Sequence, residues 1–437
     1  MPRVHRHRHR TIAFAGALAL LAILAGAPGA GGASQGRAAT LRADSRVLDL
    51  ALRHDGKIVV AGEVGRAAGR VRLMVQRLTA SGRPDPGFNR GKPYLGPPGS
   101  SANAVALAAG GRIVVAATLT NRAGFNPQGM LALRLRPNGR PDRGFGGDGR
   151  VAALRRSHGE GLAVAVRGNG AVVVGGAATT GSGDAFHRVA VAQFRPGGAP
   201  DRGFGRRGVS IQDFGRLSRA EDLALARRGK VVLAGSVRDN LQSTETLVAR
   251  LRRGGSRDRS FGSGGVVIHQ YAQGAAFSAF RSLTPRGRGR VLLAGSAISS
   301  ARGPEAIVVA LGARGHRDRS FGADGVVRLS AAASPDQYLS SSIPGAYGIT
   351  AARGGFALAG YYDQLGHQRG AVWALRPNGA LDKRFGKGGH ALTNFAARDN
   401  AIFNGLGARG RRLVAGGERT DVLDHRPQGI LRSYRLP

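Results

Sequence analysis

An aspartate and a phenylalanine recur along the chain in a D-x-x-F pattern that could either bind metal ions or form turns. Calcium prefers several oxygen ligands close together, and a second acidic residue follows this pattern only at Asp148 and Asp324. An aspartate that bonds the backbone two residues later forms a turn without metal. We therefore predict structural turns and no metal site. The six pairs are Asp85 and Phe88, Asp142 and Phe145, Asp201 and Phe204, Asp258 and Phe261, Asp318 and Phe321, and Asp382 and Phe385.

Glycines at two of these turns match the G-x-G-x-x-G pattern of dinucleotide-binding loops, at residues 144–149 and 203–208. That loop requires a helix directly after it, so that pyrophosphate meets the helix N-terminus. Here a strand-like segment follows instead. Ser236 and Ser296 follow strand-ending glycines but do not lie in a G-x-S-x-G elbow. The sequence therefore predicts no catalytic and no cofactor-binding residues.

The N-terminal segment has the pattern of an export signal. Seven arginines and histidines lie within residues 3–10, an apolar run follows to residue 27, and small residues lead to Ala33. A basic start, an apolar middle and a small-residue cleavage site are typical of a signal peptide. We predict a signal peptide over residues 1–33 and a secreted or cell-envelope protein with no membrane span after cleavage. Without cysteine, the exported chain must rely on core packing rather than on disulfides.

Between the D-x-x-F turns, each unit of about sixty residues has the pattern of four short strands. The fourth unit shows them at residues 222–226, 231–234, 247–251 and 266–267, separated by glycine-containing turns. The second and third strands are apolar on both faces, which suits sheets packed between two neighbours. No segment has a sustained helical period. The sequence therefore predicts an all-β protein, a β-propeller of seven four-stranded blades.

The two ends of the repeat array complement each other. Residues 434–436 align with the third strand of the last unit, so that unit lacks a fourth strand. Residues 38–42 precede the first complete unit and can supply it, which would close the ring and protect its edges. We predict one domain over residues 34–437. Its units span about 46–98, 99–155, 156–216, 217–273, 274–335, 336–395 and 396–437, and residues 38–42 complete the last blade.

These units resemble the delta-60 repeat family of bacterial exported proteins over essentially residues 38–437. The resemblance rests on residues 55–62, on residues 133–139, on Asp142 and on residues 145–149, and on their recurrence in register. It implies a propeller-like β array and no established chemistry. Ala117 replaces the usual second-strand glycine, and Asn89 replaces the glycine after Phe88.

The chain is strongly basic, with 65 Lys and Arg against 26 Asp and Glu and a formal net charge of +39. Many arginines fall in the predicted turns, as at Arg252, Arg257 and Arg259, which would line one rim of the ring. Such a rim could attract anionic envelope polymers or glycans. Alternatively, codon bias enriches Arg together with Ala and Gly, and the charge only keeps the protein soluble. Aromatic residues, which single-stranded nucleic acids need for stacking, make up only 5%, and we predict no sequence-specific nucleic-acid binding.

Three functions remain open from the sequence. The first is a non-enzymatic, monomeric binding or structural module at the cell envelope or outside the cell. The second is a polyanion- or glycan-binding surface protein that uses its arginine-rich rim, and the third is a hydrolase or lyase with a site in the central channel. The insertion that lengthens the fifth spacing contains Gln337 and Tyr338, which are candidate ligand contacts because loops that break a repeat often lie on its binding face.

Overall fold

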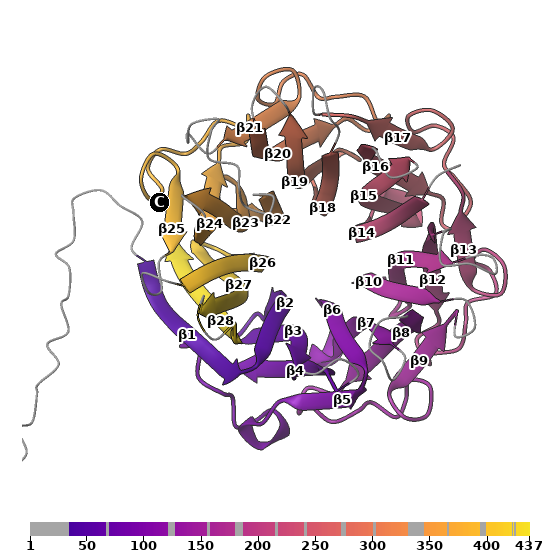
Figure 1. Ribbon diagram of the computed structural model, residues 1–437. Coiled ribbons are helices and arrows are strands. Elements are labelled where there is room, and N and C mark those ends of the chain that lie inside the picture. The colour runs from indigo at the N-terminus through magenta and orange to yellow at the C-terminus, as the bar shows by residue number, and fades with distance from the viewer. Residues whose placement is uncertain are drawn as a thin grey trace, which may run out of the picture.

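The computed structural model shows a ring of β-sheets around a central channel (Figure 1). The described residues form seven four-stranded blades, which confirms the predicted propeller. They contain no helix long and apolar enough to cross a membrane. The described residues are 35–66, 70–120, 127–154, 158–179, 187–214, 217–239, 243–271, 277–299, 303–330, 345–364, 367–393, 399–421, 423 and 425–437.

Each blade has its first strand at the channel and its fourth strand at the outer edge (Figure 1). Blades 1 to 3 comprise β2 (Ser45–Leu52), β3 (Ile58–Val64), β4 (Arg72–Leu78) and β5 (Tyr94–Pro98); β6 (Ser100–Leu107), β7 (Ile113–Thr120), β8 (Pro127–Leu135) and β9 (Arg150–Ala153); and β10 (Gly159–Val166), β11 (Val172–Thr179), β12 (His187–Phe194) and β13 (Val209–Gln212). Blades 4 to 6 comprise β14 (Leu217–Leu225), β15 (Val231–Asp239), β16 (Ser243–Leu251) and β17 (Val266–His269); β18 (Phe277–Pro285), β19 (Val291–Ser299), β20 (Gly303–Leu311) and β21 (Val326–Ser330); and β22 (Gly345–Ala352), β23 (Gly355–Gln364), β24 (His367–Leu375) and β25 (His390–Thr393). Short 3-10 turns occur at η1 (Asn89–Gly91), η2 (Ala109–Gly111) and η3 (Arg227–Gly229).

Blade 7 joins the two ends of the chain. It contains β26 (Asp399–Arg409), β27 (Arg412–Asp421) and β28 (Pro427–Arg435), and β1 (Gln35–Ala43) adds its outer strand. β1 pairs antiparallel with β28, with Ala39 opposite Leu431. The predicted closure by residues 38–42 is confirmed, and the closing strand is longer than predicted. Leu41 of β1 packs in a core cluster with residues of blades 7 and 1.

The core lies between neighbouring blades. Val59 and Val75 of blade 1, for example, pack in one cluster with Val115 and Leu133 of blade 2, all four almost fully buried. The second and third strands are covered on both faces, which explains why they are apolar on both faces. Burial of this surface is the main favourable contribution to folding in a chain without disulfides.

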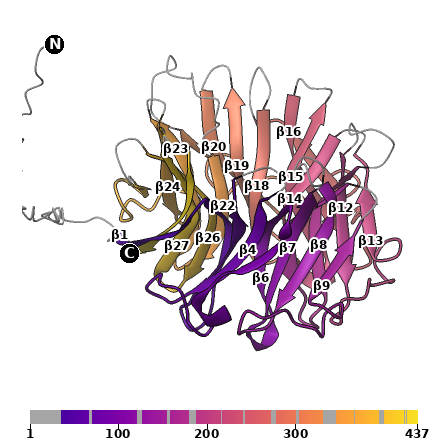
Figure 2. The same ribbon diagram turned by 60° about the horizontal axis from the view of Figure 1, so that its bottom comes forward.

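The antiparallel strands give the ring two distinct faces. Turns between first and second strands, and between third and fourth strands, lie on the face that we call the turn face. Connections between second and third strands, and between blades, lie on the opposite face, called the loop face, which points upward in Figure 2 and toward the viewer in Figure 1.

Every inner strand carries a β-bulge at the same register. A bulge inserts one extra residue and re-aims side chains locally. The bulged residues all line a cavity in the central channel, so the bulges decide which side chains the channel displays. These residues are Leu48, Asn103, Leu162, Glu221, Arg281, Tyr347 and Asn404.

Candidate functional site

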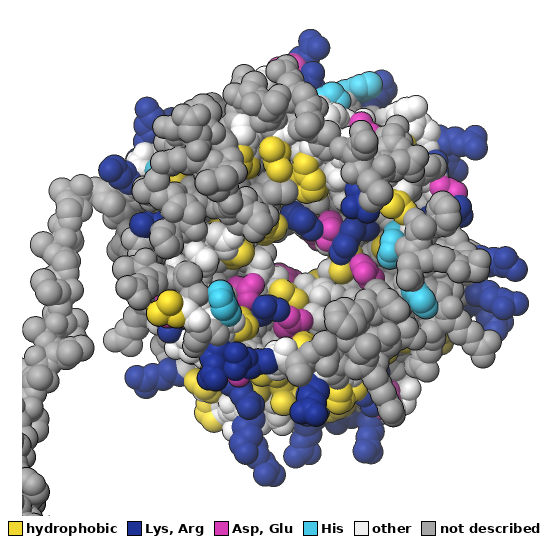
Figure 3. Space-filling view, viewed as in Figure 1, with side chains coloured by type: hydrophobic (Ala, Val, Ile, Leu, Met, Phe, Trp, Pro, Cys, Tyr) yellow, Lys and Arg dark blue, Asp and Glu magenta, His cyan; other side chains and the backbone are white. Residues whose placement is uncertain are grey.

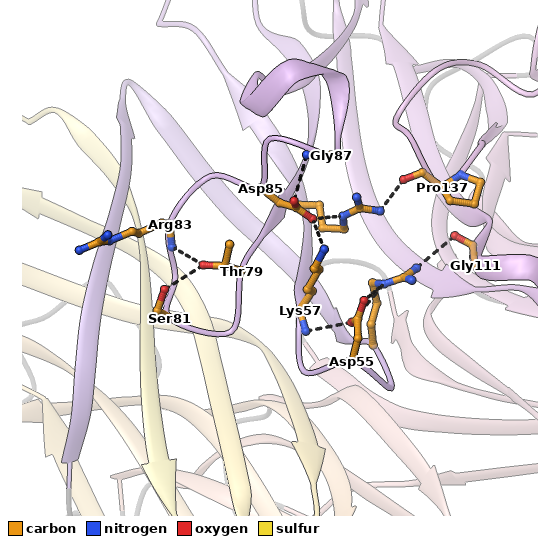
Figure 4. Close-up of polar contacts among 11 residues, drawn as sticks. Asp55, Lys57, Thr79, Ser81, Arg83, Asp85, Gly87, Gly111 and Pro137 are labelled. Carbon is orange, nitrogen blue, oxygen red and sulfur yellow. Dashed lines mark hydrogen bonds and ion pairs between the residues drawn. The ribbon is translucent and has the colours of Figure 1, made fainter.

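The D-x-x-F aspartates lie inside turns, where each is held by its surroundings. Asp85 accepts hydrogen bonds from Arg77 Nε at 2.6 Å and from the Gly87 N–H at 3.0 Å (Figure 4). It also forms an ion pair with Lys57 Nζ at 3.0 Å. Burial acts to raise the pKa of Asp85, but these hydrogen bonds outweigh it and hold the pKa below its usual value. The carboxylate therefore stays ionised and acts as the centre of the turn.

The other copies of the turn repeat this arrangement with variations. Each aspartate accepts a hydrogen bond from the backbone N–H two residues later and another from a nearby side chain. The side-chain donors are Arg134 for Asp142, Gln193 for Asp201, Arg250 for Asp258, Arg286 for Asp318 and Arg384 for Asp382. Within the described residues, no group of three His, Asp or Glu side chains could hold a metal ion.

The phenylalanine of each turn is buried and packs between neighbouring blades. Phe88 is fully buried, the Arg77 guanidinium lies over its ring, and Arg77 Nη1 donates to the Pro137 carbonyl of blade 2. A Cβ on Gly139 of that blade would lie 3.0 Å from the same ring. One arginine thus links its own aspartate, its own phenylalanine and the next blade. Phe145, Phe204, Phe261, Phe321 and Phe385 are likewise buried.

The three rim arginines named from the sequence occupy different environments. Arg257 donates to Gln212 at 3.0 Å, donates to the Asp213 carbonyl and lies 4.6 Å from the Phe214 ring centre, so it connects blade 4 to blade 3. Arg252 and Arg259 are exposed. Of the three, only these two have no side-chain hydrogen bond or ion pair with another described residue, and both lie on the turn face. Gln337 and Tyr338 lie outside the described residues.

The central channel holds two carboxylates that sequence analysis did not single out. Asp49 and Asp222 occupy the same register, directly after the bulge, in blades 1 and 4. Asp49 accepts hydrogen bonds from the Leu50 N–H at 2.7 Å and from the Val105 N–H of blade 2 at 2.8 Å. Asp222 is bonded in the same way by Leu223 at 2.7 Å and by Leu283 of blade 5 at 2.8 Å. Both carboxylates therefore connect neighbouring inner strands.

Their environment shifts both carboxylates toward the neutral form. Each side chain keeps some surface toward the channel but lies deep in a narrow cavity of about 210 Å³. This burial raises the pKa of Asp49 to about 7 and that of Asp222 to about 6, although the backbone hydrogen bonds act in the opposite direction. Two carboxylates with raised pKa values in a channel are groups that can exchange protons near neutral pH.

These two residues were predictable only in part. Asp222 stands in the sequence within a predicted first strand, but nothing there shows that a bulge turns its neighbourhood toward the channel. One sequence feature could have identified them. Two of the seven units carry an ionisable residue, Asp49 or Asp222, at the same position of an otherwise apolar first strand. Trp373, the single Trp of the chain, is 6% exposed and lies in the core.

Comparison with known families gives two matches within the chain. Residues 54–88 and 229–261 match the family described as a domain of unknown function (DUF5122) beta-propeller. Both segments include the second and third strands of a blade and end at the buried phenylalanine, in blades 1 and 4. These two segments are thus similar to a β-propeller domain of unknown function. A search of curated proteins found no match.

Solved structures with similar folds share little sequence with this chain. A protein of unknown function from Dyadobacter fermentans is 10% identical, with a TM-score of 0.44, over 92% of this chain and 99% of that one. Sqt1 from Chaetomium thermophilum is 12% identical, with a TM-score of 0.41, over 91% and 100%. A Trypanosoma rangeli sialidase is 10% identical, with a TM-score of 0.40, over 89% of this chain and 54% of that one.

Proposed function

We propose that this protein is an exported, non-enzymatic β-propeller that acts as a binding module at the cell envelope or outside the cell, and that its turn face binds an anionic polymer. We further propose that its repeats are of the delta-60 type. The observation that carries the binding proposal is an imbalance of charge on the turn face. Among the described residues, its carboxylates already have hydrogen-bond or ion-pair partners, whereas many of its arginines are exposed and show no ion pair.

The described carboxylates of the turn face already have partners within the protein, which are cationic side chains except at Asp201, where Gln193 is the side-chain donor. Besides the six turn aspartates, Asp55 pairs with Arg53 at 3.3 Å, Asp148 pairs with Arg150 at 2.9 Å, and Asp324 pairs with Arg317 at 2.9 Å. The described residues show no ion pair for a further set of exposed arginines in the same turns. This set includes Arg140, Arg143, Arg202, Arg206, Arg207, Arg228, Arg252, Arg253, Arg259 and Arg314.

Exposed guanidinium groups suit a polymer with repeated anionic groups. They bind carboxylate and phosphate through two parallel hydrogen bonds, and many of them on one face raise the local concentration of a polyanion. Figure 3, which views the ring from the loop face, shows Lys and Arg side chains that project beyond its outer edge. A polymer that follows this edge could contact several blades at once, which would add weak contacts into useful affinity.

The test measures binding of residues 34–437 to cell-envelope material, an acidic glycan and a nucleic acid over a range of salt concentrations. We expect binding at low salt that weakens as the salt concentration rises. The affinity should fall more steeply with salt when more arginines contact anionic groups of the polymer. The double variant Arg252→Glu/Arg259→Glu should bind more weakly and flatten the salt dependence by about two units of slope. Neither side chain has an ion pair or hydrogen bond with another described residue, so folding should be unaffected.

A charge-matched control uses two arginines near the loop face, Arg42→Glu/Arg66→Glu. Arg42 is exposed, and the pair between Arg66 and Asp44 is also largely exposed, so the control should remain folded. Equal loss of binding in both double variants would show that only net charge matters. Absence of binding at low salt would show that the arginine content is compositional. Either result contradicts the proposal of a binding face.

A further inference from the structure

We propose that the protein has a second binding site, on the loop face, for a small carboxylated sugar such as a hexuronic acid. The site is a cleft of about 400 Å³ at the mouth of the channel, which we call the mouth cleft. It is formed by the first-strand ends of blades 3, 4 and 5, by the β15 and β16 ends of blade 4, and by His187 at the start of β12 in blade 3. Its size lies within the range of small-molecule sites. This site is independent of the turn face.

Two arginines of the mouth cleft are fixed by acidic partners. Arg219 lies between Glu160 and Glu221, at 3.4 Å and 2.9 Å, and Arg281 pairs with Glu221 at 3.0 Å. The network spans three blades, and the charged side chains around the channel mouth are visible in Figure 3. Glu160 and Glu221 are 19% and 13% exposed and Arg219 and Arg281 are 42% and 38% exposed, so the ion pairs hold partly exposed arginines beside less exposed glutamates.

Arg238 differs from these arginines. It lies at the end of β15, is exposed, lines the mouth cleft and has no ion pair or side-chain hydrogen bond among the described residues. Its guanidinium is therefore available to a ligand and presents donors in the fork geometry that fits a carboxylate. The lining contains three arginines and two glutamates. A ligand with one negative charge would therefore balance the charges of these five side chains.

The remaining groups suit the neutral part of a sugar. Glu160 and Glu221 can accept hydrogen bonds from ligand hydroxyls, and Ser236 and Thr244 can donate or accept them. Phe277, half-buried at the start of β18, offers an apolar surface for one face of a sugar ring. Sites for small ligands combine an apolar surface with a few polar groups that fix orientation, and the mouth cleft has both.

The repeat does not itself require this charge. At the register of Arg238, five other blades carry the uncharged residues Gly65, Thr120, Thr179, Ile298 and Thr420, and blade 6 carries Asp363. At the register of Arg219, blades 2, 5, 6 and 7 carry the uncharged residues Ser101, Ala279, Gly345 and Ile402, whereas blade 1 carries Arg46 and blade 3 carries Glu160. The blades with uncharged residues adopt the same strand pairing, so pairing requires no charge at either register. No other blade carries an arginine at the register of Arg238, and this residue is therefore not explained by the needs of the fold.

The experiment measures binding of glucuronic acid to residues 34–437 by calorimetry and by ligand-detected NMR, with glucose and acetate as probes that each lack half of the ligand. We expect glucuronic acid to bind with a dissociation constant of about 1 mM or lower, and glucose and acetate to bind at least about tenfold more weakly. Arg238→Gln should weaken glucuronic acid binding at least about tenfold. It should leave the melting temperature unchanged, because the side chain has no ion pair or hydrogen bond with the part of the chain that the structure describes.

Arg42→Gln serves as the matched control, since Arg42 is also exposed but lies outside the mouth cleft. The turn-face variant Arg252→Glu/Arg259→Glu should keep full affinity for glucuronic acid, which separates failure of this proposal from failure of the turn-face proposal. The mouth-cleft site is refuted if glucuronic acid does not bind at up to about 20 mM. Equal affinity for glucose, or equal affinity of the Arg238→Gln variant, would refute it as well.

Discussion

Asp258 forms ion pairs with two cationic side chains, Arg250 and Lys230. Its carboxylate lies 2.6 Å from Arg250 Nε and 2.6 Å from Lys230 Nζ, and the Asp258 and Arg250 side chains are only 5% and 8% exposed. Removal of one partner leaves a buried charge without compensation. We predict that Asp258→Asn lowers the free energy of unfolding by about 3 kcal/mol, measured by chemical denaturation at pH 7.

The control for this variant is Asp324→Asn. Asp324 is 49% exposed and pairs with the exposed Arg317 and Arg319, so its loss should cost less than about 1 kcal/mol. The effect of pH provides a second check. Burial acts to raise the pKa of Asp258, but its hydrogen bonds lower it, so the carboxylate stabilises the fold above about pH 4 and loses this effect as the pH falls. A destabilisation that persists unchanged at low pH would contradict the electrostatic explanation.

Asp49 should have the opposite pH dependence. Burial raises its pKa to about 7 in the folded protein, so the folded state binds a proton more tightly than the unfolded chain does. The stabilising effect of that proton is complete below about pH 4 and disappears as the pH rises through about 7. The unchanged protein should therefore have a lower free energy of unfolding at pH 8 than at pH 5. We predict that this difference is smaller in the Asp49→Asn variant, by up to about 3 kcal/mol. Denaturation curves at both pH values measure it.

The exposed Asp148, 55% exposed in its pair with Arg150, offers a control for this measurement. Asp148→Asn should leave the difference between pH 5 and pH 8 as in the unchanged protein. If Asp49→Asn behaves in the same way as Asp148→Asn, the channel carboxylate does not titrate in this range.

At the scale of the strand, the glycine that recurs in the second strand is explained by the bulge of the first. Gly235 lies opposite Ala220, beside the bulge of β14, and a Cβ there would lie 2.0 Å from the Arg219 carbonyl oxygen. Gly62, Gly176, Gly295, Gly360 and Gly417 would give contacts of 1.8–2.0 Å in the same place. The two strands can approach this closely only without a side chain.

We predict that Gly235→Ala destabilises the protein by more than about 2 kcal/mol, because backbone on both strands must move. Thermal denaturation followed by circular dichroism measures the change. Gly168→Ala is the control, since a Cβ there meets nothing within 4 Å. Blade 2 carries Ala117 at this register and has the same strand pairing. If Gly235→Ala leaves the melting temperature unchanged, the backbone of blade 4 can adjust to a Cβ at this position as that of blade 2 does, and the prediction is wrong.

At the scale of the molecule, the ring depends on one strand from the start of the chain. β1 pairs with β28 along its length, and Leu41 fills the core between blades 7 and 1. Deletion of residues 35–43 would expose the edge of β28 and part of this core. Exposed edges of this kind promote association between chains.

We predict that a chain beginning at residue 44 melts at a lower temperature and associates in size-exclusion chromatography, whereas a chain beginning at residue 35 remains stable and monomeric. A peptide of residues 35–43 added to the shorter chain should raise its melting temperature, since it can occupy the open edge. Equal stability of the two chains, with no effect of the peptide, would show that the ring does not need closure by β1.

Much of this architecture could be predicted because a repeat shows the same local rule several times. The apolar second and third strands, the turn at Asp85 and Phe88, and the missing last strand all follow from periodicity and turn chemistry. The candidate sites could not be predicted to the same degree. Arg252 and Arg257 look equivalent in the sequence, yet one is exposed and the other packs on Phe214 of the preceding blade.

The sequence alone determined the all-β class, the seven units and the role of residues 38–42, because alternation, turn residues and repeat length act locally along the chain. Only the tertiary structure decided which charged groups neutralise one another and which remain available. Asp49, Asp222 and Arg238 gain their properties from strands of other blades or from positions at the channel, and electrostatic effects depend on distance and burial in space. Neither quantity can be read from separation along the chain.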